Sequence, residues 1–366
     1  MTTAEPDGLT PEQLAAFHRD GYAIIPDALP PSTVAALLDE THRLLDSLDL
    51  STHPLTRFRT GGDTGDDHVG DDYFLSSGDK IRFFLEEDAF DAAGRLVRPK
   101  HRAVNKIGHF LHGLSPPFAA LLARDPGDER GFVDGLRARP AAVARQLGYA
   151  DPRVLQSMVI CKQPEIGGAV PPHQDSTFLY TDPPSAVGFW YALEDATLEN
   201  GCLSFLPGSH RWAPVERRLV RKKPARRSAA GATKTTTTTT TTTSAREGTA
   251  EEPEPGQAGG FGNSDGDGQG TIMVPNDGPR FPRGQGYGEE AGREQDKARG
   301  YVPGEVKAGS LVLIHGNLLH KSEKNTSQKG RIIYTFHVIE GGDGHVYDER
   351  NWLQPPAEGF TKLYRS

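Results

Sequence analysis

A histidine and a carboxylate stand two residues apart in His173-Gln174-Asp175, within the segment 167–177. On an extended segment such a pair points to the same side, because the strand repeat is two residues. With a second histidine from elsewhere in the chain, this pair makes the 2-His-1-carboxylate triad that holds non-haem Fe(II) and leaves coordination positions open. A bare His-x-Asp is common by chance, so the interpretation depends on the other parts of such a site.

The second histidine has to come from a later strand. The candidates are His210, His315, His320, His337 and His345. His320 is favoured, because Ser322 follows it at strand spacing and Arg331 opens the next apolar run. A lone histidine such as His210 or His337 is more often a hydrogen-bonded structural residue than a ligand.

An Fe(II) oxygenase that uses 2-oxoglutarate needs a cation for the distal carboxylate of that cosubstrate. The arginine fork matches a carboxylate bidentately, and a serine hydroxyl beside it adds a second hydrogen bond. His320, Ser322 and Arg331 therefore indicate a ligand followed by a cosubstrate clamp. Two alternatives remain open: a catalytically silent binding protein, and a Zn(II) isomerase or hydrolase of cupin type, in which this clamp has no purpose.

Short apolar runs separated by turns predict the elements that position these residues. A capped helix is expected from Thr10 to Gly21, a strand at 22–25 and a second helix from about Ser32. Residues 51–80, rich in Gly and Asp, are expected to form an exposed loop. Further strands are expected at 154–161, 187–193, 202–206, 310–314 and 331–339. The pattern predicts an α+β, mainly β protein with a double-stranded β-helix (jelly-roll, cupin-like) core and flanking N-terminal helices.

Residues 1–366 are expected to form one domain, interrupted by an insertion at 221–300. The insertion holds the threonine run 235–243 and Gly-, Glu- and Asp-rich sequence, a composition that cannot repay its ordering entropy and predicts disorder. The patch 271–274 is a candidate ordered island. A basic run between Arg217 and Arg227 precedes the threonines, and we interpret it as a solvated loop flank rather than a nucleic-acid site.

Composition excludes several classes of protein. The net charge of -8 argues against a general nucleic-acid or anionic-membrane surface. Two cysteines, Cys161 and Cys202, exclude a disulfide framework. The start of the chain does not resemble a secretory signal, and no stretch approaches the ~18 apolar residues that span a bilayer. We therefore expect a cytoplasmic protein, monomeric, with a small-molecule substrate.

Several segments together resemble the phytanoyl-CoA dioxygenase family over nearly the whole chain outside the insertion. They are Asn105-Lys-Ile-Gly-His109, Gln156-Ser-Met158, His173-Gln-Asp175, the segments 193–202 and 205–210, Ile314-His-Gly316, His320-Lys-Ser322 and the segment 351–355. The sequence departs from the family in its insertion and at Ser204, where relatives tend to carry a large aromatic residue that could shape the substrate pocket.

The resemblance implies an Fe(II)- and 2-oxoglutarate-dependent dioxygenase that consumes O2, with ascorbate as a supporting reductant. It implies that the substrate is hydroxylated with release of succinate and CO2, since halogenating relatives replace the carboxylate ligand with a small residue. His173, Asp175 and His320 are the implied metal ligands and catalytic residues. The implied 2-oxoglutarate contacts are Lys106, Met158, Trp190, Ser322 and Arg331, with Gln174 lining the same site. The substrate itself, acyl-CoA or free metabolite, does not follow from the sequence.

Overall fold

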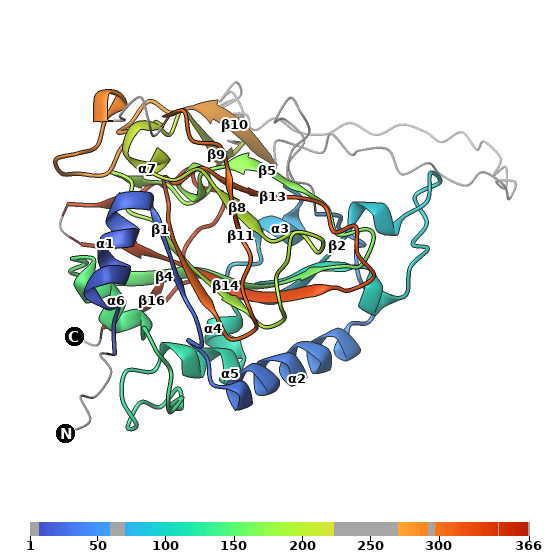
Figure 1. The fold of residues 1–366 in the computed structure, drawn as a ribbon. Helices are drawn as coiled ribbons and strands as arrows, with labels where there is room; N and C mark the ends of the chain where they lie inside the picture. Colours follow the sequence, from blue (N-terminus) through green and yellow to red (C-terminus); the bar gives the residue numbers. More distant parts are fainter. Residues whose placement is uncertain (1–6, 59–69, 223–269, 292–296, 343, 365–366) are drawn as a thin grey trace, which may run out of the picture.

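Two antiparallel sheets face one another, and helices cover the outer side of the larger sheet (Figure 1). The computed structural model describes residues 7–58, 70–222, 270–291, 297–342 and 344–364. This arrangement confirms the expected fold class, mainly β with a core of two opposed sheets and helices near the N-terminus.

The larger sheet has the long strand β14 near its middle, where it pairs with a strand on either side. Its order is β1 (Tyr22–Ile25), β12 (Leu311–His315), β7 (Val187–Ala192), β14 (Arg331–Glu340), β4 (Pro152–Lys162), β3 (Val104–His109) and β2 (Ile81–Leu85), and β16 (Thr361–Lys362) also pairs with β4. The strands predicted within 22–25, 154–161, 187–193, 310–314 and 331–339 all lie in this sheet.

The smaller sheet carries both histidines of the expected triad. Its order is β11 (Val302–Gly304), β8 (Leu203–Phe205), β13 (His320–Ser322) and β5 (Val170–His173). Two further pairs lie outside these sheets: β10 (Thr271–Pro275) with β9 (Arg217–Arg221), and β15 (Val346–Tyr347) with β6 (Thr181–Asp182).

Side chains along β14 point alternately to the two faces of the larger sheet. Tyr334 and Phe336 point toward the helices and join the main apolar core. Thr335 and His337, one residue out of phase, face the smaller sheet and line the cavity between the sheets. The inner face of the larger sheet therefore lines the cavity, while its outer face packs into the apolar core.

The helices lie mostly against that outer face, where α2, α4 and α5 run beneath β14 (Figure 1). The α-helices are α1 (Pro11–Asp20), α2 (Pro31–Ser47), α3 (Asp72–Leu75), α4 (Leu111–Leu114), α5 (Pro116–Ala119), α6 (Pro140–Gln146) and α7 (Ser209–Trp212). The 3-10 turns are η1 (Glu87–Ala89), η2 (Lys100–Arg102), η3 (Ala120–Leu122), η4 (Asp175–Thr177) and η5 (Glu289–Ala291). Within the described residues, none of the helices has the length and apolar character needed to cross a membrane.

The ends of α1 are those that the sequence predicts. The Thr10 hydroxyl accepts from the Gln13 backbone N–H, and the Gln13 side chain accepts from the Thr10 N–H, which completes a capping box. Gly21 ends the helix with φ of 84°, in the left-handed region that favours glycine.

The prediction of an exposed loop at 51–80 is wrong for part of this segment. Thr56, Phe74 and Ser77 are buried, and Asp71 caps the short helix α3. Phe74 stacks on Trp352 with ring centroids 4.3 Å apart. That partner comes from the far end of the chain, so local composition gave no sign of the burial.

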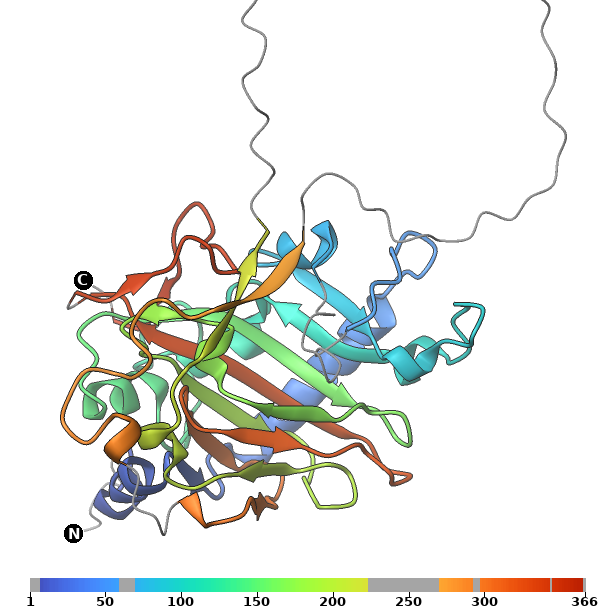
Figure 2. The ribbon, with the colours of Figure 1, turned by 90° about the horizontal axis from the view of Figure 1, so that it is seen from above.

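The predicted insertion at 221–300 is too long at its C-terminal end. Residues 223–269, which include the threonine run, lie outside the described residues, and the prediction of disorder is untested there. The patch 271–274 is ordered as part of β10, which pairs with β9 in a ribbon at one edge of the molecule, beside α3 (Figure 2). The assignment of the whole chain to one domain stays a prediction.

The basic run differs from a solvated loop flank where it is described. Arg218 is buried in β9 and forms ion pairs with Asp348 and with Asp277, the latter at 3.2 Å. The Arg221 guanidinium donates to the Trp352 carbonyl at 2.7 Å. These arginines hold β9 to the C-terminal segment, and residues 223–227 lie outside the described part of the chain.

Candidate metal and cosubstrate site

His173 and His320 are direct partners across the smaller sheet. The register of β5 and β13 places the two residues opposite one another, and their ring centroids lie 4.1 Å apart. Neighbouring antiparallel positions on one face are close enough for side chains to act together. Strand pairing thus joins the two halves of the predicted ligand set across the insertion.

Asp175 completes the group from the turn η4, which follows β5. Its Oδ1 lies 3.6 Å from Nε2 of His173 and 3.8 Å from Nε2 of His320. The ligand atoms of these three residues all lie within 4.8 Å of one another, and no other such group occurs among the described residues.

The donor set fits a divalent transition metal. Nδ1 of His173 lies 2.9 Å from the Pro171 carbonyl, and Nδ1 of His320 lies 3.0 Å from the Leu318 carbonyl. A carbonyl only accepts, so each Nδ1 carries the proton and each Nε2 presents its lone pair to the carboxylate. The two Nε2 lone pairs and the Asp175 carboxylate converge, and this arrangement favours binding of a cation between them.

Protonation of the triad is consistent with that reading. Burial, and then the neighbouring His173, lower the pKa of His320 to about 4, so its imidazole is neutral at physiological pH. Burial opposes ionisation of Asp175, but its contacts with the surrounding histidines, His337 first, outweigh burial and hold the pKa of the carboxyl well below its usual range. Neutral imidazole and ionised carboxylate are the ligand forms.

His337 holds the other oxygen of the carboxylate. Its Nε2 lies 3.2 Å from Asp175 Oδ2, and Gln156 Nε2 lies 3.5 Å from its Nδ1. Glycine at 188 leaves room for this contact, since a Cβ there would meet His337 Nε2 at 3.3 Å and Asp175 Oδ2 at 3.4 Å. From the sequence, His337 is expected to be a structural histidine, and only the fold places it against a candidate ligand.

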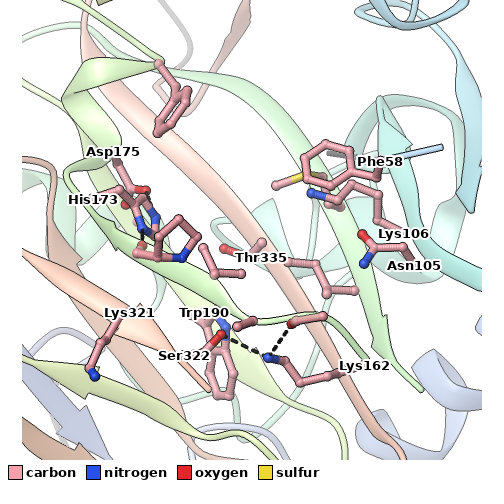
Figure 3. Close-up of a pocket in the computed structure, with 18 of the residues that line it drawn as sticks. Phe58, Asn105, Lys106, Lys162, His173, Asp175, Trp190, Lys321, Ser322 and Thr335 are labelled. Carbon is pink, nitrogen blue, oxygen red and sulfur yellow. Dashed lines mark hydrogen bonds and ion pairs between the residues drawn. The ribbon is translucent and has the colours of Figure 1, made fainter. Parts of the chain in front are cut away.

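The triad lies in a cavity of about 390 Å³ between the two sheets. Across it from His173 and Asp175 lie Lys106 and Phe58, with Ser322 and Lys162 further along (Figure 3). All the predicted metal ligands and most of the predicted cosubstrate contacts line this cavity: Lys106, Met158, His173, Asp175, Trp190, His320, Ser322 and Arg331.

Arg331 is buried at the start of β14. Its Nη1 donates to the Gly201 carbonyl at 2.6 Å, and the guanidinium carbon lies 5.3 Å from the centroid of the Trp190 ring. Among the described residues its Nε has no hydrogen-bond partner. Burial lowers the pKa of Arg331 to about 10, which leaves the side chain cationic at neutral pH. A buried guanidinium with a spare donor suits a carboxylate ligand.

Lys106 is a second buried cation. Its Nζ lies 3.1 Å from the centroid of the Phe58 ring. Burial lowers the pKa of the Lys106 ammonium to about 7, although the charge of Glu86 partly opposes that effect. Because burying the Lys106 ammonium is costly, this side chain is a candidate functional residue rather than a stabilising one.

Lys162 is a third cation of the cavity, and the sequence reasoning missed it. Its Nζ donates to Ser322 Oγ at 3.1 Å, to the Gly168 carbonyl at 2.9 Å and to the Glu323 carbonyl. Burial, followed by the charge of Arg331, lowers the pKa of Lys162 to about 7. Strand spacing from Met158 was a signal that could have found it, since both residues face the cavity from β4.

Gln174 does not line the cavity, contrary to expectation. Its Nε2 donates to the Ala213 carbonyl at 2.9 Å and the Asn317 carbonyl at 2.8 Å. The residue between His173 and Asp175 points the opposite way in extended geometry. Gln174 therefore ties the ligand segment to two neighbouring loops.

The remaining candidates also lie off the cavity. His315 and His210 pack together with ring centroids 4.9 Å apart, and His315 lies beside Phe17 of α1. His345 Nδ1 lies 3.3 Å from the Gly342 carbonyl. Ser204 is buried in β8, where its neighbour Leu203 faces the cavity. The expected influence of Ser204 on the pocket wall is therefore not direct.

Comparison with known proteins bears out the resemblance of the motifs. The profile of the family "Phytanoyl-CoA dioxygenase (PhyH)" matches residues 17–261 and 264–333. Phytanoyl-CoA dioxygenase domain-containing protein 1 of Bos taurus is 37% identical over 97% of this chain and 99% of its own length, and that of Danio rerio is 36% identical over 98% and 99%. Among solved structures, EctD from S. alaskensis with 2-oxoglutarate and 5-hydroxyectoine has a TM-score of 0.47 and 19% identity, over 93% of this chain and 78% of EctD. The chain belongs to the phytanoyl-CoA dioxygenase family.

Proposed function

We propose that the protein is an Fe(II)- and 2-oxoglutarate-dependent dioxygenase that hydroxylates a small molecule. The observation that carries the proposal is one cavity that is lined both by the convergent His173, Asp175 and His320 group and by the buried Arg331 and Ser322. A metal triad alone suits several chemistries, whereas a triad with a carboxylate clamp suits this cosubstrate.

His173 Nε2, Asp175 Oδ1 and His320 Nε2 would hold Fe(II). The bound metal would supply the oxidation, in which O2 and 2-oxoglutarate give succinate and CO2 and one oxygen atom enters a substrate C–H bond. Ascorbate would maintain Fe(II). The carboxylate at position 175 favours hydroxylation over halogenation, since it fills the place that a halide would need.

The residues around the triad would bind and orient the cosubstrate. Arg331 and Ser322 would hold its distal carboxylate, while Met158 and Trp190 would bound its carbon chain. Lys106 offers N–H donors across the cavity from the triad (Figure 3). Burial of these groups excludes water, which strengthens each charged contact.

Size and lining support a small-molecule substrate. The volume of about 390 Å³ lies near the lower end of ordinary ligand pockets, and the cosubstrate would take part of it. Phe58, Phe74, Phe178 and Trp352 supply an aromatic wall. A monomeric, cytoplasmic enzyme with no nucleic-acid or membrane partner completes the proposal.

The test is succinate release by purified protein given Fe(II), ascorbate and 2-oxoglutarate. We expect slow release without substrate and none from H173A or D175A, while H42A, which changes an exposed histidine of α2, keeps wild-type release. The proposal is contradicted if wild-type protein, loaded with Fe(II) under anaerobic conditions, fails to bind 2-oxoglutarate and releases no succinate once O2 is supplied. Candidate substrates can then be ranked by the succinate release that they stimulate.

A further inference from the structure

We infer that Lys162 is a positioning residue for the distal carboxylate of the cosubstrate, acting through the hydroxyl of Ser322. The inference rests on the proposed function. It adds Lys162, which is not part of the Arg331 and Ser322 clamp, to the residues that position the distal carboxylate. It also makes the site selective for 2-oxo acids that carry a second carboxylate.

The hydrogen bonds of Lys162 fix the direction of the Ser322 hydroxyl. An ammonium has three N–H donors and no acceptor. The acceptors of Lys162 are Ser322 Oγ at 3.1 Å, the Gly168 carbonyl at 2.9 Å and the Glu323 carbonyl, so all three donors are used. Ser322 Oγ is thereby an acceptor toward Lys162, and its own proton is left for a partner in the cavity.

The placement of Lys162 beside Arg331 is costly without an anion. The two residues are directly paired in the register of β4 and β14, and both are 3% exposed. Like charges opposite one another in a sheet are destabilising, and burial adds to the cost. In the described part of the chain, no carboxylate forms an ion pair with either side chain. The charge of Glu86, which also lines the cavity, offsets part of the cost at Lys162, and a dicarboxylate ligand would supply an anion for both side chains.

A glycine holds these two cations in place. Gly201 has φ of 80°, and its carbonyl accepts from Arg331 Nη1 at 2.6 Å. A Cβ at this position would lie 2.5 Å from the Glu323 carbonyl oxygen and 2.9 Å from Lys162 Cδ. The turn therefore packs against Lys162 on one side and anchors Arg331 on the other.

A purely structural role would give a different result from a positioning role. The carbonyls of Gly168 and Glu323 belong to loops, so Lys162 also ties the C-terminal end of β4 to the start of β5 and the end of β13. Loss of that tie alone would weaken binding of every 2-oxo acid alike. Loss of the positioned hydroxyl would weaken only ligands that have a distal carboxylate.

The test compares 2-oxoglutarate with 2-oxopentanoate, which keeps the five-carbon chain but lacks the distal carboxylate. Binding to full-length protein loaded with Mn(II) is measured by calorimetry, without turnover. We expect K162M to raise the Kd for 2-oxoglutarate by about 10-fold or more, the size of a lost charge-assisted hydrogen bond, and to leave the Kd for 2-oxopentanoate unchanged. In an S322A background the effect of K162M should shrink, because the hydroxyl that it positions is gone.

Two controls make the outcome decisive. K307M removes an exposed lysine that pairs with Asp195 at 2.8 Å, and both Kd values should stay at wild type. If K162M fails to fold, K162Q gives the same comparison. Equal weakening of both ligands, or no change in either, overturns the inference while the proposed function stands. Failure of wild-type protein to bind either ligand contradicts the proposed function itself.

Discussion

Nε2 of His337 lies 3.2 Å from Oδ2 of Asp175, so the larger sheet grips the carboxylate whose other oxygen faces the two histidines of the smaller sheet. The contact crosses the gap between the sheets and gives the two carboxylate oxygens different partners. Oδ1 is left for a metal, and Oδ2 is fixed by the protein.

This relationship predicts that His337 controls metal affinity. H337A should weaken metal binding by about 10- to 100-fold, because hydrogen-bond partners of ligands contribute on that scale. Titration with Mn(II) or Fe(II) under anaerobic conditions measures the change. H345A, which alters a histidine off the cavity, is the matched control, and equal affinities for wild type and H337A would contradict the role.

Arg331 should be essential for cosubstrate binding. R331A removes the guanidinium and is expected to raise the Kd for 2-oxoglutarate by about 100-fold, as for a buried charge-assisted pair. R331K should recover little of the loss, because a lysine cannot present the planar fork. R95A removes an exposed arginine and should bind normally in the same calorimetric assay. Intact binding by R331A would rule out the clamp.

Affinity for 2-oxoglutarate should fall as pH rises above about 7, where Lys106 loses its proton in the ligand-free protein. The bound dianion favours the charged ammonium, so binding takes up a proton above that pH and the Kd grows by at most about 10-fold per pH unit for one proton. Calorimetry in buffers of different ionisation enthalpy measures the proton uptake. K106M should reduce the proton uptake to the part that Lys162, whose pKa is also about 7, contributes, and an unchanged slope in this variant would contradict the assignment.

Alanine at position 201 should damage both stability and the cosubstrate site. The left-handed backbone costs about 1–2 kcal/mol for a residue with a Cβ. G148A carries the same cost, since Gly148 has φ of 84°, but its added Cβ would meet nothing within 4 Å. Thermal melts should therefore show a larger drop in Tm for G201A, and only G201A should weaken 2-oxoglutarate binding. Equal effects of both variants would argue against the close packing at Gly201.

Local sequence patterns sufficed for the first two helices, for most strands of the larger sheet and for the candidate metal ligands. The capping box at Thr10, the left-handed glycine at position 21 and the strand spacing of His173 and Asp175 depend on neighbouring residues only. For that reason they could be read directly from the chain. His320 followed from the same reasoning, because Ser322 lies two residues further along its strand and Arg331 opens the next strand.

Features that depend on distant partners escaped this reasoning. Phe74 is buried because Trp352 stacks on it, and residues 271–275 form a strand because β9 offers an edge. Gln174 stands between two ligands in sequence yet bonds to loops outside the cavity. No local pattern records which segment will lie opposite.

The sequence by itself thus determined the candidate site residues: His173, Asp175 and His320, with Ser322 and Arg331 after them. Only the tertiary structure decided what surrounds them. Register between strands brought His320 opposite His173 and Lys162 opposite Arg331, and the facing of two sheets brought His337 to Asp175. The physical reason is that side-chain direction along a strand has a local period, whereas pairing and burial are set by contacts between segments far apart in the chain.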